Sequence, residues 1–235
     1  MYFYMKMKEI LNYLDELGFY YYENSNLVTL IQSLQLNNNS IWLRDGKYKI
    51  LNELDIKLFP EADDLMDNVT ESSYNFLYLY RPLPPHRCFA FDKEDLYEYP
   101  PMIFENNYLC NSLSRCGIII EDVDEYEDSE GNLHLITNVR DFLICPYEFR
   151  SQFTQIYLKW RVVTARILLM LNIILSQADS DERFYVLSED GQEGDIILVL
   201  LNPEMFKFFQ DIGKLENQDV PKPVETYFES ILSLI

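Results

Sequence analysis

The pattern of hydrophobic and polar positions is most regular between residues 147 and 177. Apolar residues recur there at alternating spacings of four and three, which predicts a long amphipathic helix with one apolar seam. The seam consists of Phe149, Phe153, Ile156, Trp160, Val163, Ile167, Met170 and Ile174. The second half of the segment is apolar on its other faces too, so we expect this helix to be central in the fold.

Several antiparallel hairpins are predicted before and after this helix. Residues 40–51 carry the strongest signal, because Asp45-Gly46 supplies the positive φ angles that a two-residue turn needs. Acidic turns separate apolar runs within 118–136 and within 183–201, and each of these segments predicts a further hairpin. A short strand is expected at 88–91. Strands of this kind beside a long helix predict the α+β class.

Short helices complete the predicted set. The predicted spans are 6–17, 92–99, 103–116, 203–213 and 224–234. The first and third are followed by Gly18 and Gly117, where a helix ends, and then by a hairpin. This helix–glycine–hairpin order is found in winged helices and in many other α+β folds.

An acidic polar connector at 60–73 is the best candidate for a domain boundary. We expect an N-terminal helix-plus-hairpin module over 1–60 and an acidic α+β domain over 74–235, or a single domain that includes both.

The net charge of the chain indicates which classes of function are favoured. The chain has 39 Asp and Glu against 19 Lys and Arg, a formal net charge of −20, and residues 61–235 carry −19 of it. Such a field repels nucleic acid and anionic membranes and attracts basic proteins, although acidity also serves simply to keep a hydrophobic chain in solution. With only 7 glycines, phosphate-binding loops are scarce.

The predicted long helix has the opposite charge. Between Glu148 and Asp179 there is no acidic residue. The basic residues of the segment are Arg150, Lys159, Arg161 and Arg166. We expect these side chains to pair with surrounding carboxylates, and the alternative is that they contact an anion or a phosphate.

The cysteines indicate a reducing compartment. Cys88, Cys110, Cys116 and Cys145 form no CxxC pair, so free thiols are expected rather than disulfides. His86 with the first three of these cysteines could be drawn as a zinc set, but the short ligand spacing of a zinc knuckle is missing.

We expect a cytoplasmic protein without a membrane segment. The first ten residues lack the long apolar stretch of a secretory signal. The longest uncharged apolar run, 167–178, is too short to span a bilayer.

No catalytic, cofactor-binding or metal site is predicted. Neither histidine lies in a recognisable motif. The acidic stretch 118–136 fails the EF-hand template, because position 5 counted from Asp122 is Tyr126 and position 6 is Glu127. Asp195, Glu204 and Lys207 come near a metal-nuclease pattern but miss its spacing.

These observations favour a non-catalytic acidic protein that binds another, basic protein and regulates or inhibits it, as an immunity or antitoxin-like protein or an accessory subunit. Solvated turns are the alternative explanation of the acidic hairpin tips. The candidate partner-binding residues are Glu121, Asp122, Asp124, Glu125, Tyr126, Glu127, Asp128, Glu189, Asp190, Glu193, Tyr97 and Tyr99.

Two other functions stay open at this point. One is a winged-helix-like nucleic-acid or complex-assembly module, which would touch phosphates through Arg44, Lys47 and Lys49. The other is a metal-dependent hydrolase that uses scattered carboxylates.

Overall fold

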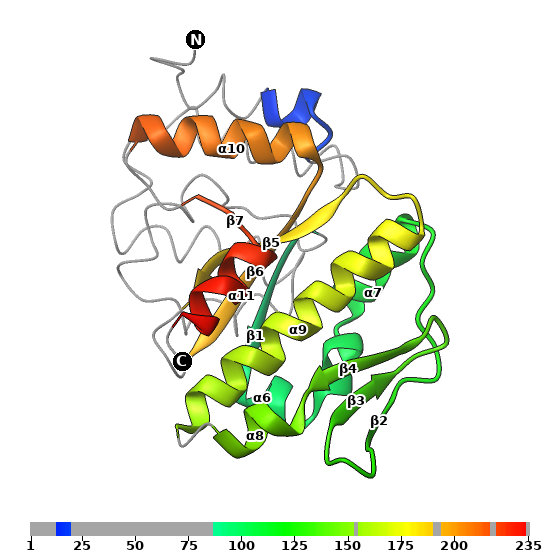
Figure 1. Cartoon of the computed structure of the whole chain (residues 1–235). Helices are drawn as coiled ribbons and strands as arrows, with labels where there is room; N and C mark the ends of the chain where they lie inside the picture. Colours follow the sequence, from blue (N-terminus) through cyan, green and yellow to red (C-terminus); the bar gives the residue numbers. More distant parts are fainter. Residues whose placement is uncertain (1–12, 20–86, 153–154, 190–193, 217–219, 234–235) are drawn as a thin grey trace, which may run out of the picture.

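The computed structural model describes residues 13–19, 87–152, 155–189, 194–216 and 220–233, and this part of the chain has the predicted α+β fold (Figure 1). Its strands form two antiparallel sheets, ordered β1-β6-β5-β7 and β2-β3-β4. The predicted hairpin at 40–51 and the connector at 60–73 lie outside the described residues, so the division into 1–60 and 74–235 stays a prediction.

The larger sheet contains the predicted hairpin of the C-terminal half, β5 (Arg183–Glu189) and β6 (Asp195–Leu201). On its two sides lie β1 (Cys88–Asp92), which pairs with β6, and the two-residue β7 (Lys222–Pro223), which pairs with β5. Proline cannot donate to a ladder, which suits Pro223 to an edge strand.

The smaller sheet contains the predicted acidic hairpin. Its strands are β2 (Asp124–Glu127), β3 (Leu133–Ile136) and β4 (Asp141–Cys145). The sequence pattern did not predict β4.

The described residues after position 86 form seven helices, one of them a 3-10 helix. They are α6 (Lys93–Glu98), η2 (Pro100–Glu105), α7 (Asn107–Arg115), α8 (Tyr147–Gln152), α9 (Ile156–Gln177), α10 (Pro203–Glu216) and α11 (Val224–Leu232). Gly18 and Gly117 both have φ of +80°, as expected for residues that end a helix. None of the described helices is long and apolar enough to cross a membrane.

The predicted long helix is confirmed over α9, but its N-terminal part is a separate helix, α8. Gln155 is extended, with φ −98° and ψ 117°, and begins α9 as its N-cap. Ile156, placed in the seam by the sequence pattern, is therefore 48% exposed, whereas the seam is buried from Trp160 to Ile174. The apolar period runs unchanged through the break, so the pattern alone could not reveal it.

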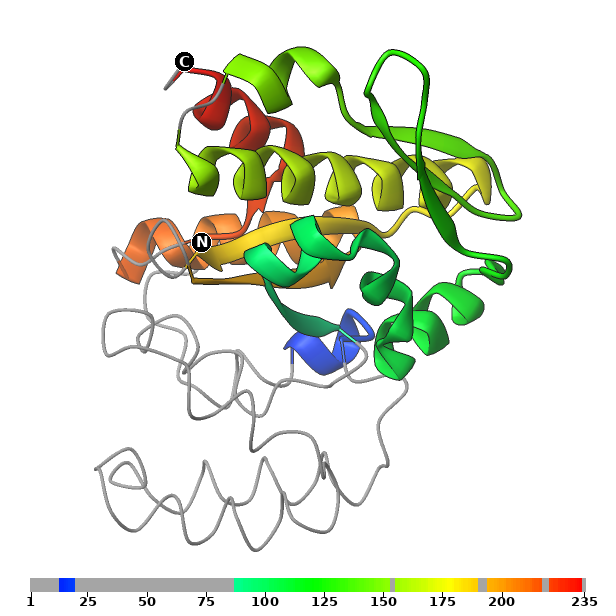
Figure 2. The ribbon, with the colours of Figure 1, turned by 90° about the horizontal axis from the view of Figure 1, so that it is seen from below.

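The larger sheet is covered on both faces (Figure 2). Along β6, alternate side chains enter two different hydrophobic clusters, as the two-residue period of a strand requires. Ile196, Leu198 and Leu200 join the cluster that includes α9 and α11. Ile197, Val199 and Leu201 join the one that includes α10 and residues 14–19. This double burial explains why β6 is a continuous apolar run.

A partly buried carboxylate joins four elements on the α9 side of the sheet. Glu189 Oε1, at the end of β5, lies 2.9 Å from Lys93 Nζ, and the Lys93 side chain is 0% exposed. Arg161 contacts both oxygens, with Nε 2.8 Å from Oε1 and Nη2 donating to Oε2 at 2.9 Å. The Tyr227 hydroxyl donates to Oε1 at 2.9 Å, and burial beside Glu189 raises the pKa of this phenol.

Arg87 ties the N-terminal segment to the larger sheet. Its Nε donates to the Phe19 carbonyl at 2.9 Å and its Nη1 to the Leu200 carbonyl at 2.9 Å. The same Nη1 lies 2.8 Å from Glu182 Oε1. The guanidinium is 3% exposed, so these acceptors replace its water shell.

Asn172 joins α9 to β5. Its Nδ2 donates to the Phe184 carbonyl at 3.0 Å, and its Oδ1 accepts from the Phe184 N–H at 2.7 Å. The buried amide thereby satisfies both backbone groups of Phe184, as a neighbouring strand would.

The four cysteines are free, as predicted, with Cys88 and Cys145 buried and Cys110 and Cys116 half-buried. Burial raises the pKa of each thiol, so the thiol form is favoured.

We predict that Glu189→Gln lowers the free energy of unfolding by about 3–5 kcal/mol, because Lys93 and Arg161 lose the carboxylate that they share. Tyr227→Phe removes one hydrogen bond and is expected to cost about 1 kcal/mol. Urea denaturation measures both, with exposed Glu98→Gln on α6 as the charge-matched control, expected within about 0.5 kcal/mol of the unchanged protein. A Glu189→Gln effect as small as that of the control would contradict this account.

We predict that Asn172→Leu destabilises the protein by about 2–4 kcal/mol, since two buried backbone groups of Phe184 lose their partner. Hydrogen exchange at the Phe184 amide should accelerate in step. In the control Ser176→Ala, only a hydroxyl that donates to the Asn172 carbonyl within α9 is lost. Equal stabilities of the two variants would show that the bridge between α9 and β5 is unimportant.

Candidate functional site

The solvent-facing side of β2-β3-β4 is the candidate site. The pairing register places six side chains there in two rows of three, and we call them the sheet face: Tyr126, His134 and Leu143, then Asp124, Ile136 and Asp141. The opposite side of the same strands is buried in the core, with Leu135, Phe142 and Ile144.

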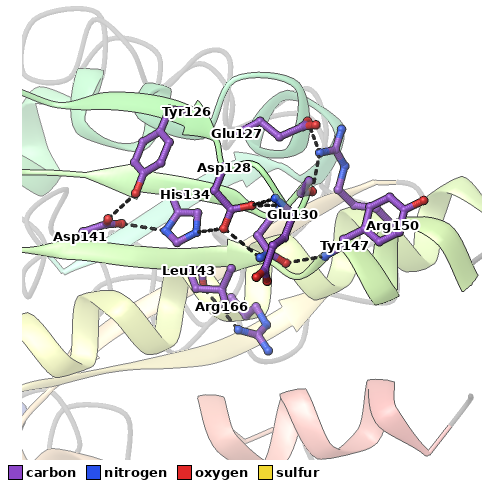
Figure 3. Close-up of polar contacts among 12 residues, drawn as sticks. Tyr126, Glu127, Asp128, Glu130, His134, Asp141, Leu143, Tyr147, Arg150 and Arg166 are labelled. Atoms are coloured by element: carbon purple, nitrogen blue, oxygen red, sulfur yellow. Dashed lines mark hydrogen bonds and ion pairs between the residues drawn. The ribbon is translucent and has the colours of Figure 1, made fainter.

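His134 lies at the centre of the sheet face, between two carboxylates (Figure 3). Its Nδ1 is 2.9 Å from Asp141 Oδ1 and its Nε2 is 3.2 Å from Asp128 Oδ2. A neutral imidazole has one N–H, so only the imidazolium form donates to both acids. The ring of Tyr126 stacks on the imidazole with centroids 4.9 Å apart.

Tyr126 is fixed at both ends. Its ring is held by the stack on His134, and its hydroxyl donates to Asp141 Oδ2 at 2.5 Å. This hydrogen bond raises the pKa of Tyr126 and lowers the pKa of Asp141. The result is an aromatic side chain that stays 41% exposed in one defined orientation.

Asp128 organises the turn between β2 and β3. Its carboxylate accepts from the Glu130 and Asn132 N–H groups at 2.8 and 2.9 Å, and from Asn132 Nδ2 at 2.9 Å. Donation from Asn132, first by its side chain, lowers the pKa of Asp128 to about 2. Gly131 has φ of +83°, a conformation that favours glycine. The acidic tip is thus an ordered turn.

Three of the four cations of the predicted basic segment contact the small sheet or Glu189. Arg150 on α8 forms an ion pair with Glu127 and donates to the Gly131 carbonyl at 3.2 Å. Arg166 on α9 donates to the Leu143 carbonyl at 3.2 Å and lies over the rings of two phenylalanines. With Arg161 bound to Glu189, the expected pairing is confirmed for two of the arginines, while Arg166 has a carbonyl and rings as partners.

The structure divides the predicted partner-binding residues into four groups. Five are exposed on the acidic hairpin and two are half-buried there; in chain order these seven are Glu121, Asp122, Asp124, Glu125, Tyr126, Glu127 and Asp128. Tyr97 and Tyr99 lie at the end of α6, outside this sheet, and Asp190 and Glu193 lie outside the described residues. Glu189 is engaged inside the protein by Lys93 and Arg161, so it does not contribute to an exposed acidic surface.

Four members of the sheet face were not predicted: His134, Ile136, Asp141 and Leu143. His134 and Ile136 alternate with Leu133 and Leu135 in β3, a period that could have placed them on the solvent side. Asp141 and Leu143 required β4, for which no strand was predicted.

The residues considered for metal chemistry are not brought together. Asp195 begins β6, whereas Glu204 lies in α10 beyond the other end of that strand, which is about 20 Å long at the rise of a strand. Cys110 Sγ lies 3.0 Å from the Phe104 carbonyl and Cys116 Sγ 3.8 Å from Glu182, whereas His86 lies outside the described residues. Within the described ranges, no three His, Cys, Asp or Glu side chains gather as metal ligands.

A groove of about 480 Å³ lies apart from the sheet face, between α9, β5 and α10. Its lining is mainly apolar and includes Leu169, Ile173, Tyr185 and Phe206. The last two side chains stack with ring centroids 4.1 Å apart.

Comparisons of the chain with protein-family models, with curated proteins and with solved structures found no match. The roles of the residues above are therefore argued from geometry and charge alone.

We predict that Asn132→Ala raises the pKa of Asp128 from about 2 towards its ordinary value near 3.8, because the carboxylate loses a side-chain donor. Carboxyl-carbon NMR titration measures this shift. The control Asn138→Ala removes an amide that contacts Ile119 and Glu121, and it should leave the Asp128 titration unchanged.

The lowered pKa of Asp128 also determines how the stability of the folded protein changes with pH. The pKa of Asp128 is lower in the folded state, so its contribution is fully present above about pH 4 and is lost as the pH falls through about 2. In Asn132→Ala this loss should begin at a higher pH. Identical acid unfolding curves for the two proteins would contradict the assignment of the turn.

Proposed function

We propose that this protein is a non-catalytic binding protein whose sheet face docks a basic partner protein and thereby regulates or inhibits it. The observation that carries the proposal is the juxtaposition of half-exposed apolar side chains and acidic residues on one face of a small ordered sheet.

Charge supports a basic partner. Residues 118–152, which contain this sheet, have nine acidic residues and two arginines, a formal charge of −7 with His134 neutral. One of the arginines, Arg150, is already paired with Glu127. Opposite charge raises the rate of encounter and disfavours acidic competitors. The order α7, Gly117, hairpin agrees with the winged-helix alternative, but an acidic wing would repel phosphates.

The apolar members of the sheet face support docking rather than simple solvation. Ile136 is 39% exposed and Leu143 is 40% exposed; Leu143 lies in the same row as Tyr126 and His134, and Ile136 lies in the neighbouring row. Exposed acids such as Glu121 and Asp122 lie in the preceding loop. An apolar centre with a charged rim is the usual anatomy of a protein interface.

The rigidity of Tyr126 favours the same function. Its ring and hydroxyl are both held before any partner arrives, so little side-chain freedom is lost on binding. Aromatic anchors of this kind contribute strongly to binding free energy.

We predict that Leu143→Arg weakens binding of the partner at least tenfold, because it places a positive charge on the sheet face beside His134. Cross-linking and affinity capture from the native host would identify the partner, and calorimetry with the purified pair would give Kd. Leu232→Arg is the matched control, since Leu232 on α11 is 38% exposed and lies outside the sheet.

Binding of the unchanged protein should also weaken steadily as salt rises from 50 to 500 mM, since exposed charges are screened. A captured partner whose affinity changes neither with Leu143→Arg nor with salt would overturn the proposed function. Thermal unfolding of each variant checks that the fold is retained.

A further inference from the structure

The outer edge of β2 is the feature of the sheet face that specifies the form of a partner. The sheet order ends at β2, and among the described strands none pairs with it on the side away from β3 (Figure 1). Three of its four residues are acidic, and only Tyr126 is not.

Hydrogen-bonded and non-hydrogen-bonded residue pairs alternate along the hairpin, and this alternation shows which backbone groups face the outer edge of β2. The Asp128 N–H donates to the Asn132 carbonyl at 3.0 Å, so this pair faces inward. Hydrogen-bonded pairs alternate along an antiparallel ladder, which makes Tyr126 with His134 the next inward pair. The N–H and C=O groups of Glu125 and Glu127 are therefore directed away from β3. The Glu125 N–H donates to Asp124 Oδ1 at 2.8 Å, so an added strand must displace this contact.

We infer that the partner presents an extended basic segment that adds to the outer edge of β2 as a fourth strand. This inference rests on the proposed function and deepens it, because it specifies the conformation and charge of the segment that binds. Addition of a strand supplies main-chain hydrogen bonds for affinity and alternating side-chain contacts for specificity.

Charge decides between a basic segment and a second copy of this chain. Two copies of β2 edge to edge would set Asp and Glu side chains against one another, and like charges directly opposite are destabilising. A strand with closely spaced Lys or Arg meets Asp124 and Tyr126 on the solvent side, where a cation can lie over the Tyr126 ring. On the other side it meets Glu125 and Glu127.

The probe for this inference is the peptide Lys-Val-Lys-Val-Lys-Val-Lys, acetylated and amidated at its ends and carrying a fluorescent label. Its comparison peptide has the same sequence with N-methyl groups on the three central residues, which removes backbone donors without changing charge. We expect fluorescence anisotropy at 50 mM salt to show binding of the first peptide, weakened at least tenfold by methylation.

The protein variants are Glu127→Pro and its matched control Glu127→Ala. Both remove the Glu127 charge and the ion pair with Arg150, but only proline also removes the outward N–H. We expect Glu127→Pro to bind the unmethylated peptide at least fivefold more weakly than Glu127→Ala. In the unchanged protein, exchange of the Glu127 amide should slow at least tenfold when this peptide is added. This measurement and the methylated peptide test the inference even where the proline variant fails to fold.

The outcomes separate the two proposals. Strand addition would be overturned if the two peptides bound equally and the Glu127 amide gained no protection from exchange. The proposed function would still stand if Leu143→Arg weakened peptide binding. If neither peptide binds, the inference is overturned as well. The proposed function then fails only if the affinity of the captured partner changes neither with Leu143→Arg nor with salt. A gel-filtration shift to a dimer without peptide would indicate pairing with a second copy and overturn the inference.

Discussion

The partly buried carboxylate of Glu189 sets the position of the elements around α9. The Lys93 side chain is 0% exposed and the Arg161 side chain 12% exposed, and cations in such places require a counter-charge within hydrogen-bond distance. One carboxylate supplies it for both and also accepts from Tyr227, so α6, α9, β5 and α11 meet at two oxygen atoms. Apolar packing between these elements would tolerate small shifts, whereas the hydrogen-bond geometry at Glu189 tolerates few.

The same helix determines how charge is distributed between the inside and the outside of the protein. Arg161 points to Glu189, Arg166 reaches the carbonyl of Leu143 in β4, and Arg150 from α8 binds Glu127. Arg161 and Arg166 are used in holding the core and the small sheet together, and Arg150 pairs with one exposed acid of the hairpin, Glu127. An acidic surface around a basic central helix is thus one arrangement and not two separate features.

The elements predicted correctly from the sequence are those that local chemistry determines. Gly117 ends α7 because its φ is positive, and β6 is apolar throughout because both its faces are covered. The break before α9 and the strand β4 have no such local mark. The setting of His134 was unpredictable for a related reason: its two acids come from the turn before β3 and the strand after it, and Asp141 is placed only once β4 is known.

A small sheet that only keeps the protein in solution and one that binds a partner differ in the solvent-facing side chains that they need. Single exposed apolar side chains are common on soluble proteins. On the sheet face, Ile136 and Leu143 lie exposed beside a Tyr126 that is held in one orientation, and the proposed function gives this grouping a use. The acids of β2 oppose pairing of this apolar surface with another copy of itself, and the same acids favour a basic strand. In the proposed function, repulsion of self and attraction of a basic partner follow from one set of side chains.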